Sequence, residues 1–278
     1  MKYGACTTME HYRELCGIGY DYLELPGTTV HAMDMAAVRE AAKMIRDAGK
    51  PCIGFNAYCD GSLPIVGDGY RKEMVYAYAR ELCEKGSILG AGNLGIGSPA
   101  ARRLPPGYDT GLADAQCSEF LRVTAEVAAE YGMQVLFESL NRTMCNYMTD
   151  TVQAWKLARG LDLDNVKLVL EFCHAALEGE KLTDLECVMP EVRHLHISGF
   201  EADGSRYHLR EKDEGFCAEC LSWARKLGYD GTISVEAGSS HFKDEAAASL
   251  RRLKAAEELC RTLQASEIRK NAKERCEE

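Results

Sequence analysis

The feature that most constrains the fold is an alternation of two hydrophobic patterns, repeated eight times along the 278 residues. Short apolar runs typical of buried strands occupy residues 2–7, 22–26, 52–58, 93–98, 134–139, 167–174, 192–199 and 232–238. Segments with apolar residues three or four positions apart, typical of amphipathic helices, occupy residues 11–17, 35–48, 70–84, 112–131, 151–159, 182–188, 217–227 and 243–263. Eight strand–helix units predict a single (β/α)₈ barrel of the α/β class, with a doubly wound open sheet as the alternative.

The length agrees with one catalytic domain, because about 250 residues is typical of one such barrel. We expect the barrel to occupy residues 1–263 and a charged helical tail to occupy residues 264–278. The longest irregular segment, residues 98–110, contains three prolines and follows the fourth expected strand, so we expect it to form a loop at the active site.

Composition restricts the partners and the compartment. The formal net charge of −10 disfavours a nucleic-acid partner and an anionic membrane surface, although a few arginines could still hold a small anionic substrate. No segment resembles a signal peptide or a transmembrane helix, and the thirteen cysteines lack the spacing of a disulfide framework. We therefore expect a cytoplasmic protein with a small-molecule substrate, and a homo-oligomer (dimer or tetramer) is compatible with the sequence.

Acidic and histidine side chains gather near the ends of the last four expected strands. In a barrel, these carboxyl ends build the active site, and a carboxylate in an apolar strand is unfavourable unless it is paired or bound to a metal. Three carboxylates and one imidazole suit Mn²⁺ best, with Mg²⁺, Co²⁺ or Zn²⁺ as alternatives. Since His196 lies nearer the mouth than His194, we expect His196 to be the ligand and His194 to be a hydrogen-bonded core residue. The predicted metal ligands are Glu138, Glu171, His196 and Glu236.

Four segments carry a resemblance to a known family. They are FESLNRTMCN at 137–146, GSPAARRLPP at 97–106, HLHI at 194–197 and LGYDGTISVE at 227–236. They resemble the sugar phosphate isomerase/epimerase family of xylose-isomerase-like TIM barrels, which includes D-psicose and D-tagatose 3-epimerases. The resemblance extends over nearly the whole chain.

The resemblance implies a divalent-metal-dependent isomerase or epimerase of a sugar or keto-sugar derivative. Glu138 and Glu236 would be both metal ligands and the two proton carriers of a reaction through an enediolate. The implied substrate-binding residues are His174, Arg206, Glu24 and Asn141. For Glu24, a buried ion pair is an equally good interpretation.

Three positions depart from the family pattern. Glu171 replaces the usual Asp ligand, Met144 stands where the epimerases have a substrate-holding glutamate, and Ala202 replaces an arginine for which Arg206 is a substitute. These departures affect the substrate shell more than the metal ligands. A modified sugar, a keto-glycoside, a sugar acid or a cyclitol is therefore as reasonable a substrate as a free ketose.

Three other functions use the same fold. A lyase that dehydrates a keto-cyclitol or sugar acid would share the first proton transfer, and a non-catalytic sugar-binding homologue would keep the metal without turnover. A DNA-repair endonuclease is disfavoured, because it needs a multi-zinc cluster with more histidines than the seven in this chain, and the negative charge opposes DNA.

Overall fold

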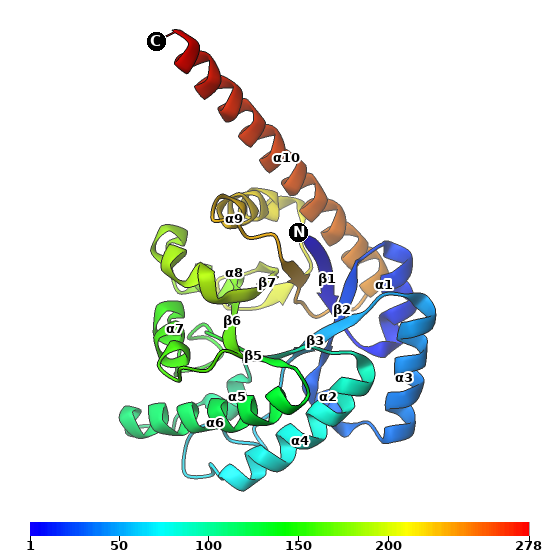
Figure 1. Ribbon diagram of the computed structural model, residues 1–278, viewed down its shortest axis with the longest axis vertical. Helices are drawn as coiled ribbons and strands as arrows, with labels where there is room; N and C mark the ends of the chain where they lie inside the picture. The colour runs from blue at the N-terminus through cyan, green and yellow to red at the C-terminus, as the bar shows by residue number, and fades with distance from the viewer. Residues whose placement is uncertain (278) are drawn as a thin grey trace.

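The alternating pattern folds into a closed parallel barrel surrounded by helices (Figure 1). The computed structural model describes the backbone of residues 1–277 and the side chains of residues 1–262. Going around the barrel, the strand order is β1, β10, β7, β6, β5, β4, β3, β2, and each neighbouring pair is parallel. The (β/α)₈ prediction is confirmed, and the open doubly wound sheet is excluded.

The eight barrel strands are short and mostly buried. They are β1 (Lys2–Cys6), β2 (Tyr22–Pro26), β3 (Cys52–Asn56), β4 (Asn93–Ile96), β5 (Gln134–Glu138), β6 (Val166–Glu171), β7 (Val192–Ile197) and β10 (Thr232–Val235). The larger helices are α1 (Tyr12–Ile18), α3 (Met35–Ala48), α4 (Lys72–Leu89), α6 (Thr110–Glu130), α7 (Thr151–Arg159), α9 (Glu214–Lys226) and α10 (Phe242–Glu277). Their buried side chains pack against the outside of the barrel and form one continuous core with it.

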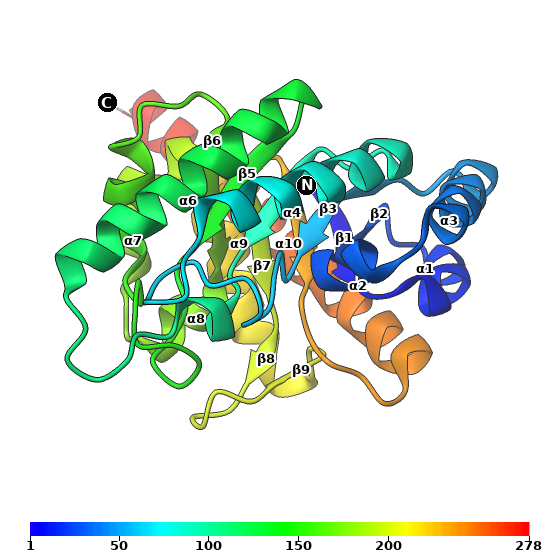
Figure 2. The same cartoon turned by 90° about the horizontal axis from the view of Figure 1, so that it is seen from below.

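Three short helices and one hairpin add to the expected pattern. The helices are α2 (Gly27–Ala32), α5 (Pro99–Arg102) and α8 (Phe172–Leu177), and the hairpin pairs β8 (Gly199–Phe200) with β9 (Arg206–Tyr207). Figure 2 shows this hairpin extending from the end of β7. The segment 98–110, expected to be irregular throughout, therefore begins with the helix α5.

The expectation that the sixth strand continues to residue 174 is wrong. β6 ends at Glu171, and α8 begins at Phe172. The Glu171 carboxylate accepts a hydrogen bond of 2.8 Å from the backbone N–H of Cys173, which satisfies a free donor at the helix start. His174 therefore lies on a helix, beyond the end of the strand.

The segment between α8 and β7 also differs from the prediction. A helix with 3.6-residue periodicity was expected at 182–188, but residues Leu182–Glu191 form a 3₁₀ helix that contains Pro190. Proline has no N–H to donate and clashes with the preceding turn, which opposes a regular α-helix there.

α10 extends well beyond the barrel in Figure 1. The predicted charged tail at 264–278 falls on residues whose side chains lie outside the described part of the chain. Among the described helices, none combines the length and apolar character needed to cross a membrane.

Candidate metal centre

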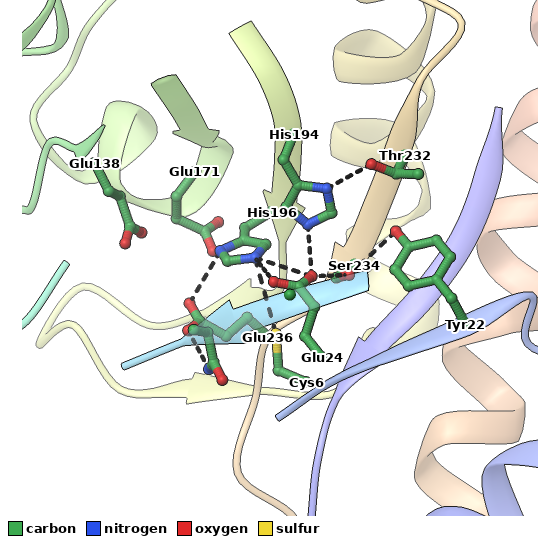
Figure 3. Close-up of polar contacts among 12 residues, drawn as sticks. Cys6, Tyr22, Glu24, Glu138, Glu171, His194, His196, Thr232, Ser234 and Glu236 are labelled. Carbon is green, nitrogen blue, oxygen red and sulfur yellow. Dashed lines mark hydrogen bonds and ion pairs between the residues drawn. The ribbon is translucent and has the colours of Figure 1, made fainter. Parts of the chain in front are cut away.

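The four predicted ligands come together at one end of the barrel (Figure 3). Glu138 and Glu171 end β5 and β6, His196 lies near the end of β7, and Glu236 follows β10. The register places Glu171 beside His196 and His196 beside Ser234, so these strands present their polar residues at one level. One donor atom from each of the four residues lies within 4.8 Å of the others. The carboxylates of Glu138 and Glu236 therefore share one site.

The donor atoms fit a bound cation. The Oε1 atom of Glu138 and the Nδ1 atom of His196 are buried and lack a hydrogen-bond partner among the described residues. Nδ1 of His196 lies 3.6 Å from Oε2 of Glu236. A buried lone pair without a partner is unfavourable unless a ligand completes it. Three carboxylates and one imidazole are a donor set suited to a hard or borderline divalent ion.

Two of the carboxyl groups have elevated pKa values. Burial raises the pKa of Glu138 to about 8, and the nearby charge of Glu236 adds to this effect. Burial also raises the pKa of Glu171 to about 7, against the effect of Arg206. A cation here would therefore displace protons from the metal-free protein.

Glu236 has the opposite protonation behaviour. Burial would raise its pKa, but Arg206 and His196 outweigh that effect and hold the pKa at about 2. Nη1 of Arg206 lies 2.5 Å from Oε2 of Glu236 and 3.5 Å from Oε2 of Glu171. Because Arg206 belongs to the β8–β9 hairpin, this hairpin carries a positive charge into the carboxylate cluster.

Asn56 is a contributor that the sequence analysis did not select. Its Nδ2 donates a hydrogen bond of 2.8 Å to Oε1 of Glu236 from the end of β3. In the sequence, Asn56 is a single polar residue near the end of an apolar run, and one amide at such a position is weak evidence for a functional site.

Asn141 and His174 form a buried pair beside Glu138. The Asn141 amide nitrogen lies 2.8 Å from Nδ1 of His174, and Nε2 of His174 lies 3.6 Å from Oε1 of Glu138. Burial lowers the pKa of His174 to about 3, so the ring is neutral. Because an amide nitrogen is a donor only, Nδ1 accepts and the ring proton resides on Nε2, on the side of Glu138.

Glu24 lies behind His196, where it contacts both barrel histidines. Its side chain is buried, with 4% of its surface exposed. Of the two roles expected for Glu24, these contacts are those of a buried ion pair, and its role in substrate binding stays a prediction.

A cleft of about 460 Å³ opens next to the four ligands. Asn56, Arg206 and Glu236 connect it to the carboxylate cluster, and its outer wall includes Thr8, His11 and Phe242. The rings of His11 and Phe242 stack with their centroids 4.7 Å apart. The volume lies within the range of about 300–1,000 Å³ that is typical of small-molecule sites.

Gly97, just beyond β4, gives Glu138 the space it occupies. A Cβ atom at Gly97 would lie 2.4 Å from Oε2 of Glu138. We expect Gly97→Ala to fold, because a flexible carboxylate can turn away, but to weaken Mn²⁺ binding by roughly 10–100-fold. Gly61→Ala is the matched control, since its Cβ would meet Ala100 at an ordinary 3.6 Å. Titration calorimetry measures both, and equal affinities would show that the position of Glu138 does not matter.

Comparison with known proteins agrees with this fold. The xylose isomerase-like TIM barrel family model matches residues 13–260. The chain belongs to this family.

Two curated relatives are similar in sequence. A 3-dehydro-D-guloside 4-epimerase from Escherichia coli K12 is 24% identical over 253 residues, which cover 86% of this chain and 92% of the relative. An inosose isomerase from Halalkalibacterium halodurans is 30% identical over 128 residues, which cover 43% of this chain and 45% of the relative.

Solved structures share the same barrel. The apo form of a 3-keto-D-glucoside 4-epimerase from E. coli has a TM-score of 0.73 at 21% identity, with 92% of this chain and 99% of that chain covered. A D-tagatose 3-epimerase-like protein has a TM-score of 0.79 at 15% identity, with 94% of this chain and 99% of that chain covered. The resemblance noted in the sequence to this family is confirmed.

Proposed function

We propose that this protein is a divalent-metal-dependent epimerase of a keto-sugar derivative, with Mn²⁺ as the preferred ion. The observation that carries the proposal is the convergence of Glu138, Glu171, His196 and Glu236 within 4.8 Å, with two buried donor atoms that lack a partner. These four residues would hold the cation. When bound, the cation supplies Lewis acidity that makes the C–H bond next to a substrate carbonyl easier to deprotonate.

In this proposal, the chain's own groups carry the proton. Glu138 and Glu236 extend from β5 and β10, on opposite sides of the cluster, so each can face one side of a substrate carbon. One carboxylate removes a proton and the other returns one to the opposite face. Paired acid–base catalysis of this kind contributes about 10²–10⁴-fold.

The surrounding polar groups would orient the substrate. Nε2–H of His174 lies on the side of Glu138, and Arg206 lies at the boundary of the cluster and the cleft. Both can donate to substrate oxygens, which is the role proposed for them, and Asn141 fixes the His174 ring.

A keto-glycoside is the substrate that we favour. The cleft of about 460 Å³ is lined by Thr8, His11 and Phe242 as well as by Glu236, so a glycosidic group could occupy it beside the reacting ring. One curated relative, which covers 86% of this chain, is named for a dehydro-guloside, which is also a glycoside.

A keto-cyclitol is the second candidate substrate. The observation that favours it is the relative of 30% identity named an inosose isomerase. A dehydratase acting on such a compound would use the same first proton transfer and then expel a hydroxyl group.

Deuterium exchange separates these functions. The Mn²⁺-loaded protein is incubated in D₂O with a 3-keto-glucoside and, separately, with an inosose. We expect one deuterium at the carbon beside the carbonyl, together with an epimeric product, and no loss of water. Loss of water would identify a lyase, and the absence of exchange with either compound would identify a non-catalytic homologue.

A further inference from the structure

The His196 ring has two different environments on its two nitrogens. Nδ1 faces the carboxylate cluster, whereas Nε2 lies 3.4 Å from Oε1 and 3.3 Å from Oε2 of Glu24 (Figure 3). Glu24 comes from the middle of β2 and is 4% exposed. One carboxylate therefore lies behind the ring, on the side away from the proposed cation.

Glu24 is itself held from several directions. Nε2 of His194 lies 2.6 Å from its Oε1, and the Ser234 hydroxyl donates to the same oxygen. Nδ1 of His194 lies 2.7 Å from the Thr232 hydroxyl, which fixes that ring in turn. The groups that contact Glu24 come from β7 and β10, so the carboxylate has little freedom to turn.

This geometry determines which His196 nitrogen is available. An ionised carboxylate can only accept hydrogen bonds, so the nitrogen that faces it must carry the proton. A protonated Nε2 leaves the lone pair of a neutral imidazole on Nδ1.

We propose that Glu24 is a positioning residue of the cation site, which keeps Nε2 of His196 protonated so that the ring presents Nδ1 to the ion. His194, Ser234 and Thr232 keep Glu24 aligned. This inference rests on one part of the proposed function, which is that the four ligands bind a cation. It assigns a role to a buried carboxylate that the proton-transfer mechanism does not use.

A competing arrangement involves the same atoms. Cys6, Glu24 and His196 also place one donor atom each within 4.8 Å of one another, and the Cys6 sulfur lies 3.9 Å from Nε2 of His196. A second ion there would require a deprotonated Nε2. Our proposal therefore predicts one bound ion per chain, and two ions would overturn it.

Mn²⁺ affinity of the full-length protein tests the role of Glu24. We expect Glu24→Gln to raise the Kd for Mn²⁺ by roughly 10–100-fold, as is typical for removal of a group that orients a metal ligand. Tyr22→Phe is the matched control, because Tyr22 is fully buried and contacts Ser234 without contacting His196. Equal affinities of wild type and Glu24→Gln would overturn the proposal.

Nitrogen-15 NMR of the Mg²⁺-loaded wild type tests the tautomer without any variant. The expected result is a slowly exchanging proton on Nε2 of His196 and a metal-shifted Nδ1. A proton on Nδ1 would overturn the proposal even if Glu24→Gln does not fold. If the wild type shows the Nε2–H signal but does not exchange the substrate C–H proton in D₂O, only the proposed epimerase function is contradicted.

Discussion

Replacing either Glu138 or Glu236 with glutamine is expected to reduce deuterium exchange into the substrate by about 10²–10⁴-fold. Each carboxylate is proposed to move a proton on one face of the reacting carbon. Glutamine keeps the size of the glutamate side chain and one oxygen that can bind a metal, but its amide cannot accept and return the substrate proton. Exchange is measured by mass spectrometry in D₂O, and the bound Mn²⁺ per chain is measured on the same samples.

Glu191→Gln is the matched control for these two variants. Glu191 and Lys167 form an ion pair of 2.6 Å where β7 and β6 begin. The predicted metal ligands lie where these strands end, so Glu191 is away from the cluster. It should leave exchange unchanged. If Glu138→Gln or Glu236→Gln binds Mn²⁺ and exchanges deuterium at the wild-type rate, that residue is not a proton carrier.

The barrel was predictable because its signal is repeated. Each of the eight units has a short apolar run followed by a segment with helical periodicity. The predicted bounds of β2, α3 and α7 equal the observed ones. Errors occurred where local chemistry overrides periodicity. β6 stops at Glu171 because that side chain caps α8, which no hydrophobic pattern indicates.

The cluster was also predictable, since parallel strands bring their carboxyl ends to one face and four successive strands carried a ligand type. The choice of His196 over His194 depended on depth along one strand. His196 is the histidine whose donor atom lies beside the three carboxylates, and its role as a metal ligand stays a prediction.

The contacts that Asn56 and Arg206 make with the predicted ligands were not predictable, although the resemblance had already assigned Arg206 to the substrate site. Asn56 contacts Glu236 across 180 residues, and Arg206 reaches the cluster from a hairpin that has only two residues in each strand. Glu24 could not be assigned between substrate and ion pair, because sequence shows that an acid is present but not which side chains face it. In the structure, the Glu24 carboxylate faces His194 and Ser234.

Arg206 neutralises part of the negative charge of the carboxylate cluster. Its guanidinium contacts Glu236 and Glu171, and the remaining carboxyl, Glu138, is partly neutralised by its proton near neutral pH. A divalent ion must therefore compete with protons and with one guanidinium for the same oxygens. This competition would make the proposed metal binding sensitive to pH.

The metal-free protein is expected to lose stability as the pH rises from about 6.5 to about 8.5, above the range in which the neutral His174 ring has the opposite effect. The folded chain keeps protons on Glu138 and Glu171, with pKa values of about 8 and about 7, which the unfolded chain has already released. The pKa of His196 is also raised, because Glu24 outweighs the effect of burial. A group with a raised pKa in the folded state contributes stability below its unfolded pKa and loses it as the pH rises.

Saturating Mn²⁺ should reverse this loss, because the ion replaces the same protons. We expect the apparent affinity to increase at least about tenfold between about pH 6 and about pH 8, and the metal-induced rise in Tm to increase in parallel. Glu138→Gln removes one of the titrating groups, so its affinity should depend less steeply on pH. Calorimetry in two buffers of different ionisation enthalpy measures the released protons directly. Affinity that is independent of pH, with no proton release, would show that these carboxyl groups are already ionised in the metal-free protein.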